Sequence, residues 1–198
     1  MNFGNSTSGS INPLNLQKGN LLDLTKEAPS LKNCIVACGW KAGGNFDLDA
    51  SAFMLDSNGR VTDSATRVVY FGKKQQEGIF SEADNTTGTE TSSVDAERIH
   101  VALEKIPADV HEIVFTVNIF EAMKKRQTFG MVKDSYIRIL DKDNGEAEVA
   151  RYELRDNAAN STAVIFGALK RNGNGWTFET IGESLVVEDL NGLLMRYS

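Results

Sequence analysis

Two aspartates separated by one residue are the first feature of the chain that could carry chemistry. Asp47 and Asp49 lie in residues 46–53, which are otherwise apolar apart from one serine. If this segment is a strand, both carboxylates point to one face with Cα atoms ~6.6 Å apart. At a separation of ~6 Å and an effective dielectric constant of ~20, their repulsion costs about 3 kcal/mol before salt screening. A hard divalent cation such as Ca²⁺ would offset this repulsion, because oxygen atoms are its usual ligands.

A second stretch rich in oxygen-bearing side chains, residues 82–97, could complete such a site. Its candidate ligands are Asp84, Asn85, Asp95 and Glu97, and Glu121 after another apolar run is a further candidate. An isolated pair of aspartates is more often solvated on an exposed sheet face. Several kinds of oxygen ligand on one loop are typical of calcium, which takes about 6–8 of them. The two stretches together therefore favour a calcium site.

The spacing excludes a contiguous EF-hand. Counted from Asp47 as the first loop position, the sixth residue is Ala52 rather than glycine and the twelfth is Asn58 rather than glutamate. A loop counted from Asp141 fails as well, because its sixth residue is Glu146. Any calcium site must therefore be assembled from separate segments of the chain.

Enzymatic motifs are missing from the sequence. It has no G-x-S-x-G elbow, no phosphate-binding P-loop and no G-x-G-x-x-G at a strand-to-helix junction. His100 and His111 are the only histidines, and neither has an evident nucleophile beside it. We therefore expect a protein that is not an enzyme.

The alternative is that the same acidic cluster serves a hydrolase, a small-ligand binder or a nucleotide-binding protein. A carboxylate pair for glycoside hydrolysis stays open, because its geometry arises only on folding. A binder would have a concave pocket above Asp47 and Asp49, lined by aromatic rings such as Phe46, Phe80 or Trp176.

Composition is that of a soluble globular protein. The 198 residues are 41% hydrophobic and 24% charged, with a net charge of −6. No apolar run approaches the ~20 residues of a membrane-spanning helix, so we expect no direct membrane insertion. The acidic balance and the scattered short basic clusters argue against nucleic-acid binding. The first 17 residues carry no positive charge and no apolar core of a signal peptide, so we expect a cytoplasmic protein.

The two cysteines are expected to be buried free thiols. Cys34 and Cys38 lie in an apolar stretch, and on a strand their Cα atoms would be ~13 Å apart. A disulfide requires Cα atoms within ~7 Å. No third sulfur or nearby imidazole supports a zinc site.

Apolar segments of strand length dominate the chain. They are residues 34–40, 49–55, 67–72, 98–103, 112–120, 136–140, 147–154, 162–169 and 176–183. Turn signals at 56–59, 143–145 and 172–175 predict three hairpins. Residues 106–110 suit one helical turn, and residues 121–128 suit a short helix. This pattern predicts an all-β fold, an antiparallel β-sandwich of two sheets with one or two short helices. Residues 1–12 are expected to be a flexible tail and 13–198 a single domain.

Several blocks of the chain resemble the TerD family of tellurium-resistance and stress proteins. Gly39-Trp40 with residues 46–55 is similar to the family signature, and residues 84–88 are similar to its GDNxTG loop. Further blocks that match in order are 106–110, 113–115, 127–130, 136–138, 150–154, 162–167 and 175–178. The resemblance spans about residues 14–185.

This resemblance implies a β-sandwich that binds one or two calcium ions. The ligands it implies are Asp47, Asp49, Asp84, Asn85, Asp95, Glu97 and Glu121. It also implies a role in resistance to tellurite and to related phage, colicin or envelope stress. That role would be exerted through metal-organised interactions with protein partners, a membrane-associated tellurium-resistance complex among them. The chain departs from the family pattern at three places: Lys41 replaces an aspartate, Ala83 replaces a glycine, and Asp134-Ser135 replaces Asn-Ala.

Overall fold

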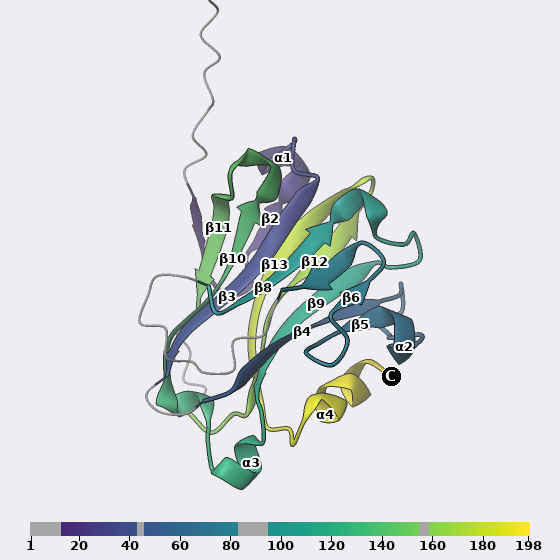
Figure 1. The fold of residues 1–198 in the computed structure, drawn as a ribbon. Coiled ribbons are helices and arrows are strands. Elements are labelled where there is room, and N and C mark those ends of the chain that lie inside the picture. The colour runs from purple at the N-terminus through teal and green to yellow at the C-terminus, as the bar shows by residue number, and fades with distance from the viewer. Residues whose placement is uncertain (1–12, 43–45, 83–94, 155–158) are drawn as a thin grey trace, which may run out of the picture.

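Two β-sheets packed face to face form the body of the molecule (Figure 1). The structure is a computed structural model that describes residues 13–42, 46–82, 95–154 and 159–198. The predicted all-β sandwich is confirmed. The expected tail at residues 1–12 lies outside the described residues, as do Asp84 and Asn85.

Each sheet combines strands that follow one another in the sequence with strands that are distant in it. The first sheet runs in the order β1 (Leu14–Leu16), β11 (Ala147–Glu153), β10 (Val132–Asp141), β3 (Asn33–Ala42), β8 (Glu97–Ala102), β7 (Ile79–Ser81) and β6 (Gln75–Gln76). The second runs β2 (Leu21–Asp23), β13 (Gly175–Leu185), β12 (Ala163–Asn172), β9 (Glu112–Ile119), β4 (Leu48–Leu55) and β5 (Val68–Val69). Strand β1 runs parallel to β11, and the other neighbouring strands of the described residues run antiparallel.

The described residues hold four short α-helices where the sequence predicted one or two. They are α1 (Leu24–Glu27), α2 (Ser64–Arg67), α3 (Ala122–Lys125) and α4 (Leu190–Leu194), and α3 lies inside the predicted helix at 121–128. Asp23, Asp63 and Asp189 cap the other three by accepting a backbone N–H of the first turn. The sequence pattern did not predict α1, α2 and α4, because helices of four or five residues are too short to show a helical hydrophobic period. None of the helices in the described part of the chain has the length and apolar character needed to cross a membrane.

Two of the three predicted hairpins form as expected. Asn172 pairs with Gly175 where β12 turns into β13, and a 3-10 turn at Lys142–Asn144 joins β10 to β11. The turn at 56–59 also forms, with the Asp56 N–H donating to the Arg60 carbonyl. It does not make a direct hairpin, because α2 intervenes before β5 pairs with β4. Residues 106–110 make a turn instead of a helical turn, and a 3-10 turn precedes it at Leu103–Lys105.

The second sheet is buried on both faces. Leu48, Ala50, Ala52 and Met54 of β4 point into the core between the sheets. The alternate side chains Phe53 and Leu55 pack in a separate cluster on the outer face with the C-terminal residues Leu190, Leu193, Leu194 and Tyr197. Leu193 has no exposed surface. The C-terminal segment therefore turns the outer face of β4 and β9 into a buried layer.

Candidate functional site

Asp49 lies directly across from Asn118 on the neighbouring strand. Their pairing belongs to the antiparallel register of β4 and β9, in which Ser51 also faces Thr116. Since the flanking residues of Asp49 point into the core, its carboxylate and the Asn118 amide lie on the outer face. Both side chains are buried, at 5% and 6% exposure. The sheet thus presents an acidic and an amide oxygen side by side in a buried position.

Three side-chain oxygens on this face lack hydrogen-bond partners among the described residues. They are Ser51 Oγ, Thr116 Oγ1 and Asn118 Oδ1. A buried polar atom without a partner costs about 1–3 kcal/mol. The unpartnered amide oxygen of Asn118, beside the Asp49 carboxylate, is a suitable ligand for a hard cation. The two hydroxyl groups on this face also offer oxygen atoms, which are the ligands that such a cation prefers. The donor set of this face therefore fits calcium.

Asp47 lies immediately before β4 and is half-buried. Its backbone carbonyl accepts the N–H of Phe120 at 2.8 Å, which fixes the start of β4 to the end of β9. Asp47 and Asp49 are thus held at the same end of the sandwich as Asn118.

Glu97 occupies a different surface, at the start of β8. It lies opposite Cys38 of β3 and is 4% exposed. Burial raises the pKa of the Cys38 thiol, and the negative charges of Glu97 and Asp95 raise that pKa further. Burial likewise raises the pKa of Cys34 to about 12. Both cysteines are buried and free, as predicted.

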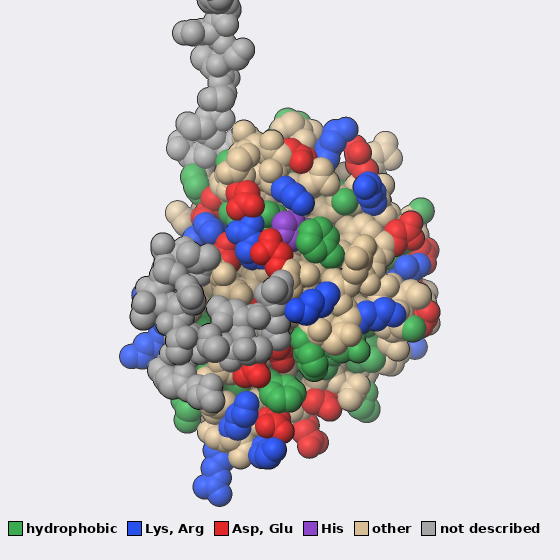
Figure 2. Space-filling model, in the orientation of Figure 1, with side chains coloured by type: hydrophobic (Ala, Val, Ile, Leu, Met, Phe, Trp, Pro, Cys, Tyr) green, Lys and Arg blue, Asp and Glu red, His purple; other side chains and the backbone are tan. Residues whose placement is uncertain are grey.

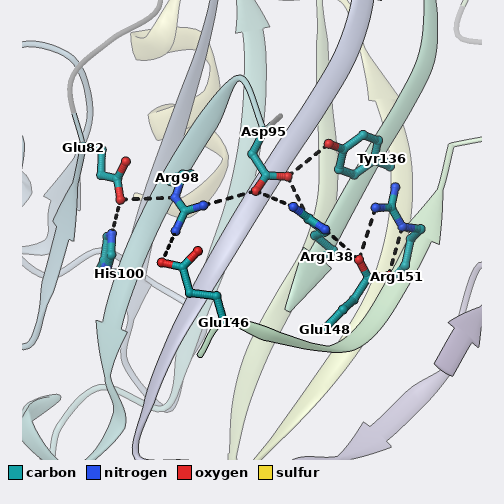
Figure 3. Close-up of polar contacts among 9 residues, drawn as sticks. All are labelled: Glu82, Asp95, Arg98, His100, Tyr136, Arg138, Glu146, Glu148 and Arg151. Carbon is teal, nitrogen blue, oxygen red and sulfur yellow. Dashed lines mark hydrogen bonds and ion pairs between the residues drawn. The ribbon is translucent and has the colours of Figure 1, made fainter. Parts of the chain in front are cut away.

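Asp95 is held by arginine rather than lying open to a metal (Figure 3). Arg138 donates from Nε and Nη2 to its two carboxylate oxygens, each at 2.8 Å, and the Tyr136 hydroxyl donates at 3.0 Å. Burial and the Asp95 charge raise the pKa of Tyr136 to about 12. The negative charge of the buried Asp95 is therefore already balanced.

Arg98 connects the residues on either side of segment 83–94. It donates to Glu82 at 3.1 Å, to Asp95 at 3.5 Å and to Glu146 at 2.7 Å (Figure 3). Acidic and basic side chains accordingly intermingle on this face of the molecule (Figure 2). His100 Nε2 lies 2.5 Å from Glu82, and its ring stacks on Phe80 with centroids 4.3 Å apart. Arg98 is thus placed to fix both ends of the segment that carries Asp84 and Asn85.

Glu121 lies beyond the end of β9, in a left-handed conformation with φ of 54°. Its carboxylate accepts a hydrogen bond from Lys124 at 2.8 Å, and this pair holds the pKa of Glu121 below its usual range. Among the residues that the structure describes, no three His, Cys, Asp or Glu side chains are grouped so that they could hold a metal ion. The predicted ligands are therefore divided among several surfaces, with Asp47 and Asp49 together at one of them.

Asn118 is the site residue that the sequence reasoning missed. It is the one strongly polar residue inside the apolar run 113–120, and this interruption of the run is the sequence feature that could have identified it.

A second feature appears at two positions that depart from the family pattern. Lys41 and Asp134 form an ion pair at 2.8 Å across β3 and β10, so the two departures compensate each other in charge.

The aromatic rings expected to line one pocket lie in different places. Phe46 and Trp176 belong to the core between the sheets. Phe80 lies against His100 on the first sheet. A pocket does lie beside Asn118, and Phe53, Tyr70, Phe71 and Phe120 line it instead.

Comparisons with known proteins agree on one family. The family profile described as the TerD domain matches residues 13–197. A tellurium resistance protein TerD of an Alcaligenes species is 41% identical over 174 residues, which cover 85% of this chain and 89% of that protein. Stress response protein SCP2 of Bacillus subtilis is 35% identical over 201 residues, 93% of this chain and 98% of that protein.

A solved structure has a similar fold. The crystal structure of a homologue of a telluride resistance protein from Streptomyces coelicolor superposes with a TM-score of 0.66. It covers 85% of this chain and 99% of its own, at 18% sequence identity. At that identity the likeness concerns the fold alone.

Proposed function

This chain belongs to the TerD domain family, and from that premise we propose that it is a calcium-binding stress protein and not an enzyme. Its relatives carry names that describe tellurium resistance and stress response. The proposed role is resistance to tellurite and to related phage, colicin or envelope stress. None of these relatives' names states a reaction, which agrees with a non-enzymatic role.

The observation that carries the calcium proposal is the buried Asp49 carboxylate beside the unpartnered Oδ1 of Asn118. Asp47, Asp49 and Asn118 would hold the ion from the sheet. Asp84 and Asn85 would contribute from segment 83–94, whereas Glu97, which lies in the other sheet at the start of β8, is not assigned to this ion. When bound, the ion would supply positive charge that neutralises the carboxylates.

Asp95 and Glu121 receive different roles in this proposal. Asp95 already has Arg138 as its partner, and Glu121 already has Lys124. We assign Asp95 and Arg98 to anchoring the ends of segment 83–94, because Arg98 contacts both Glu82 and Asp95. The anchored segment and the ion together would form a surface that binds a protein partner in the cytoplasm. The partner we propose is a membrane-associated tellurium-resistance complex.

A thermal melt tests the calcium proposal. The midpoint is measured for the full chain in excess calcium and in excess chelator, for the wild type and for Asp49→Asn. At a free calcium concentration one hundred times the dissociation constant, binding to one site adds about 2.7 kcal/mol of stability. The wild type should therefore melt higher in calcium, and the variant should lose most of that difference.

Glu104→Gln is the control, because Glu104 is exposed and forms an ion pair with Lys32. It should keep the full calcium-dependent shift. Identical wild-type midpoints in calcium and in chelator would remove the proposal.

A further inference from the structure

A pocket of about 570 Å³ opens on the outer side of the second sheet. Phe53 of β4 and Asn118 of β9 line it from the sheet. Its walls come from α2 and the β5 region, from the α3 region and from α4, and these helices surround the lower part of the molecule in Figure 1. The volume falls within the ~300–1,000 Å³ of pockets that hold small molecules.

Exposed aromatic rings concentrate at this pocket. Phe71 is 47% exposed and Phe120 is 40% exposed. Their rings meet edge to face with centroids 6.2 Å apart, and Tyr70 meets Phe71 in the same way at 5.5 Å. Met123, 52% exposed, lines the same pocket. The pocket thus offers apolar and aromatic surface to an apolar body.

The charged residues of the pocket are mainly acidic. Glu121, Glu188 and Asp189 contribute carboxylates, and Lys124 contributes an ammonium group that is already paired with Glu121. The Lys125 ammonium lies 5.1 Å from the centre of the Phe120 ring, so one of these rings already interacts with a cation. Negative charge and aromatic faces together favour a positively charged guest.

We propose that this pocket binds a small organic cation, an ammonium group attached to an aromatic or aliphatic body. The Oδ1 atom of Asn118, which has no hydrogen-bond donor among the described residues, would accept an N–H of the ammonium. The body would lie against Tyr70, Phe71 and Phe120, and Glu188 would add electrostatic attraction. This proposal does not depend on the calcium site. Among the residues that line the pocket, Asn118 and Glu121 alone were also considered as calcium ligands.

The test is a calorimetric titration of the full chain with 2-phenylethylammonium in excess chelator. Chelator removes any competition between calcium and the probe for Asn118. Two analogues of similar size accompany it: neutral 2-phenylethanol and anionic 3-phenylpropionate. The ammonium compound should bind saturably and about tenfold more tightly than the alcohol. The carboxylate should show no saturable binding.

Variants locate the binding. Met123→Ala and Glu188→Gln should each weaken binding of 2-phenylethylammonium about fivefold. Met131→Ala is the matched control, because Met131 is also 52% exposed but does not line the pocket. It should leave the affinity unchanged. The proposal is overturned if the ammonium compound does not bind saturably, if the carboxylate binds equally well, or if Met131→Ala weakens binding as much as Met123→Ala.

Discussion

Arg138 of β10 engages both carboxylate oxygens of Asp95 in a two-pronged ion pair, with each N···O distance at 2.8 Å. The Asp95 side chain has no exposed surface. A buried carboxylate that lost this partner would remain charged in a poorly solvated place, which is strongly unfavourable. The pair therefore matters for stability more than an exposed ion pair would.

Arg138→Leu is expected to lower the free energy of unfolding by about 3–5 kcal/mol, because it removes the two-pronged partner of Asp95 and leaves the more distant Arg98 as its counter-charge among the described residues. Arg138→Lys should recover part of this loss, since it restores the charge but not the two-pronged geometry. Urea unfolding measures both. Lys32→Leu is the control, because Lys32 and Glu104 form an exposed pair at 3.1 Å. A loss for Arg138→Leu no larger than that of the control would refute this interpretation.

Stability should fall in acid partly through Glu148. Burial favours the neutral form of this carboxyl, but hydrogen bonds from Arg151 and Arg138 outweigh burial and hold its pKa below the usual 4.5. The stabilising contribution of Glu148 is therefore complete above that usual value and is lost as the pH falls through the lower pKa of the folded state.

Urea midpoints measured between about pH 6 and pH 3 check this dependence. Glu148→Gln should flatten the acid side of the curve relative to the wild type. Glu104→Gln, at an exposed carboxylate, should reproduce the wild-type curve. An unchanged slope in Glu148→Gln would show that other carboxylates carry the acid response.

The C-terminal helix should contribute strongly to stability. Leu193 of α4 is fully buried against the outer face of the second sheet. Leu193→Ala is expected to cost about 2–5 kcal/mol, as other buried leucines do when truncated. Met195→Ala, at a side chain that is 77% exposed, should cost almost nothing. Equal unfolding midpoints for the two variants would contradict the packing described for this segment.

Neither cysteine should react in the folded protein. Cys34 and Cys38 are both buried, and burial raises their thiol pKa values, so the reactive thiolate is scarce. A colorimetric disulfide reagent should detect no free thiol in the native state and two thiols in denaturant. Rapid modification of the native protein would contradict the burial of these residues.

Alternating apolar residues were enough to predict the sandwich and nine of the thirteen strands in the described residues, but not the short strands β1, β2, β6 and β7. They were not enough to predict that the outer face of β4 is buried, because the covering residues 190–197 lie more than 130 positions away in the sequence. The sequence singled out Asp49 as a candidate ligand, whereas the place of Asn118 beside it depends on the register of β4 with β9. Strand register is a long-range property that a single sequence does not state.

Ion pairing explains the remaining differences at the site. Asp95 was grouped with the calcium ligands because it is acidic and close in sequence to Asp84. The order β10-β3-β8 brings Arg138 to it from a strand about 40 residues away in the sequence. Glu121 has a local partner, Lys124, that the sequence already contained at the spacing typical of a helical ion pair.

Isothermal titration of metal-stripped protein with calcium tests the central claim most directly. The wild type should release or absorb heat with a saturable isotherm, Asp49→Asn should lose it, and Glu121→Gln should retain it because Glu121 already pairs with Lys124. A wild-type protein that gives no binding heat at several temperatures, or an Asp49→Asn variant that binds calcium as the wild type does, would contradict the claim.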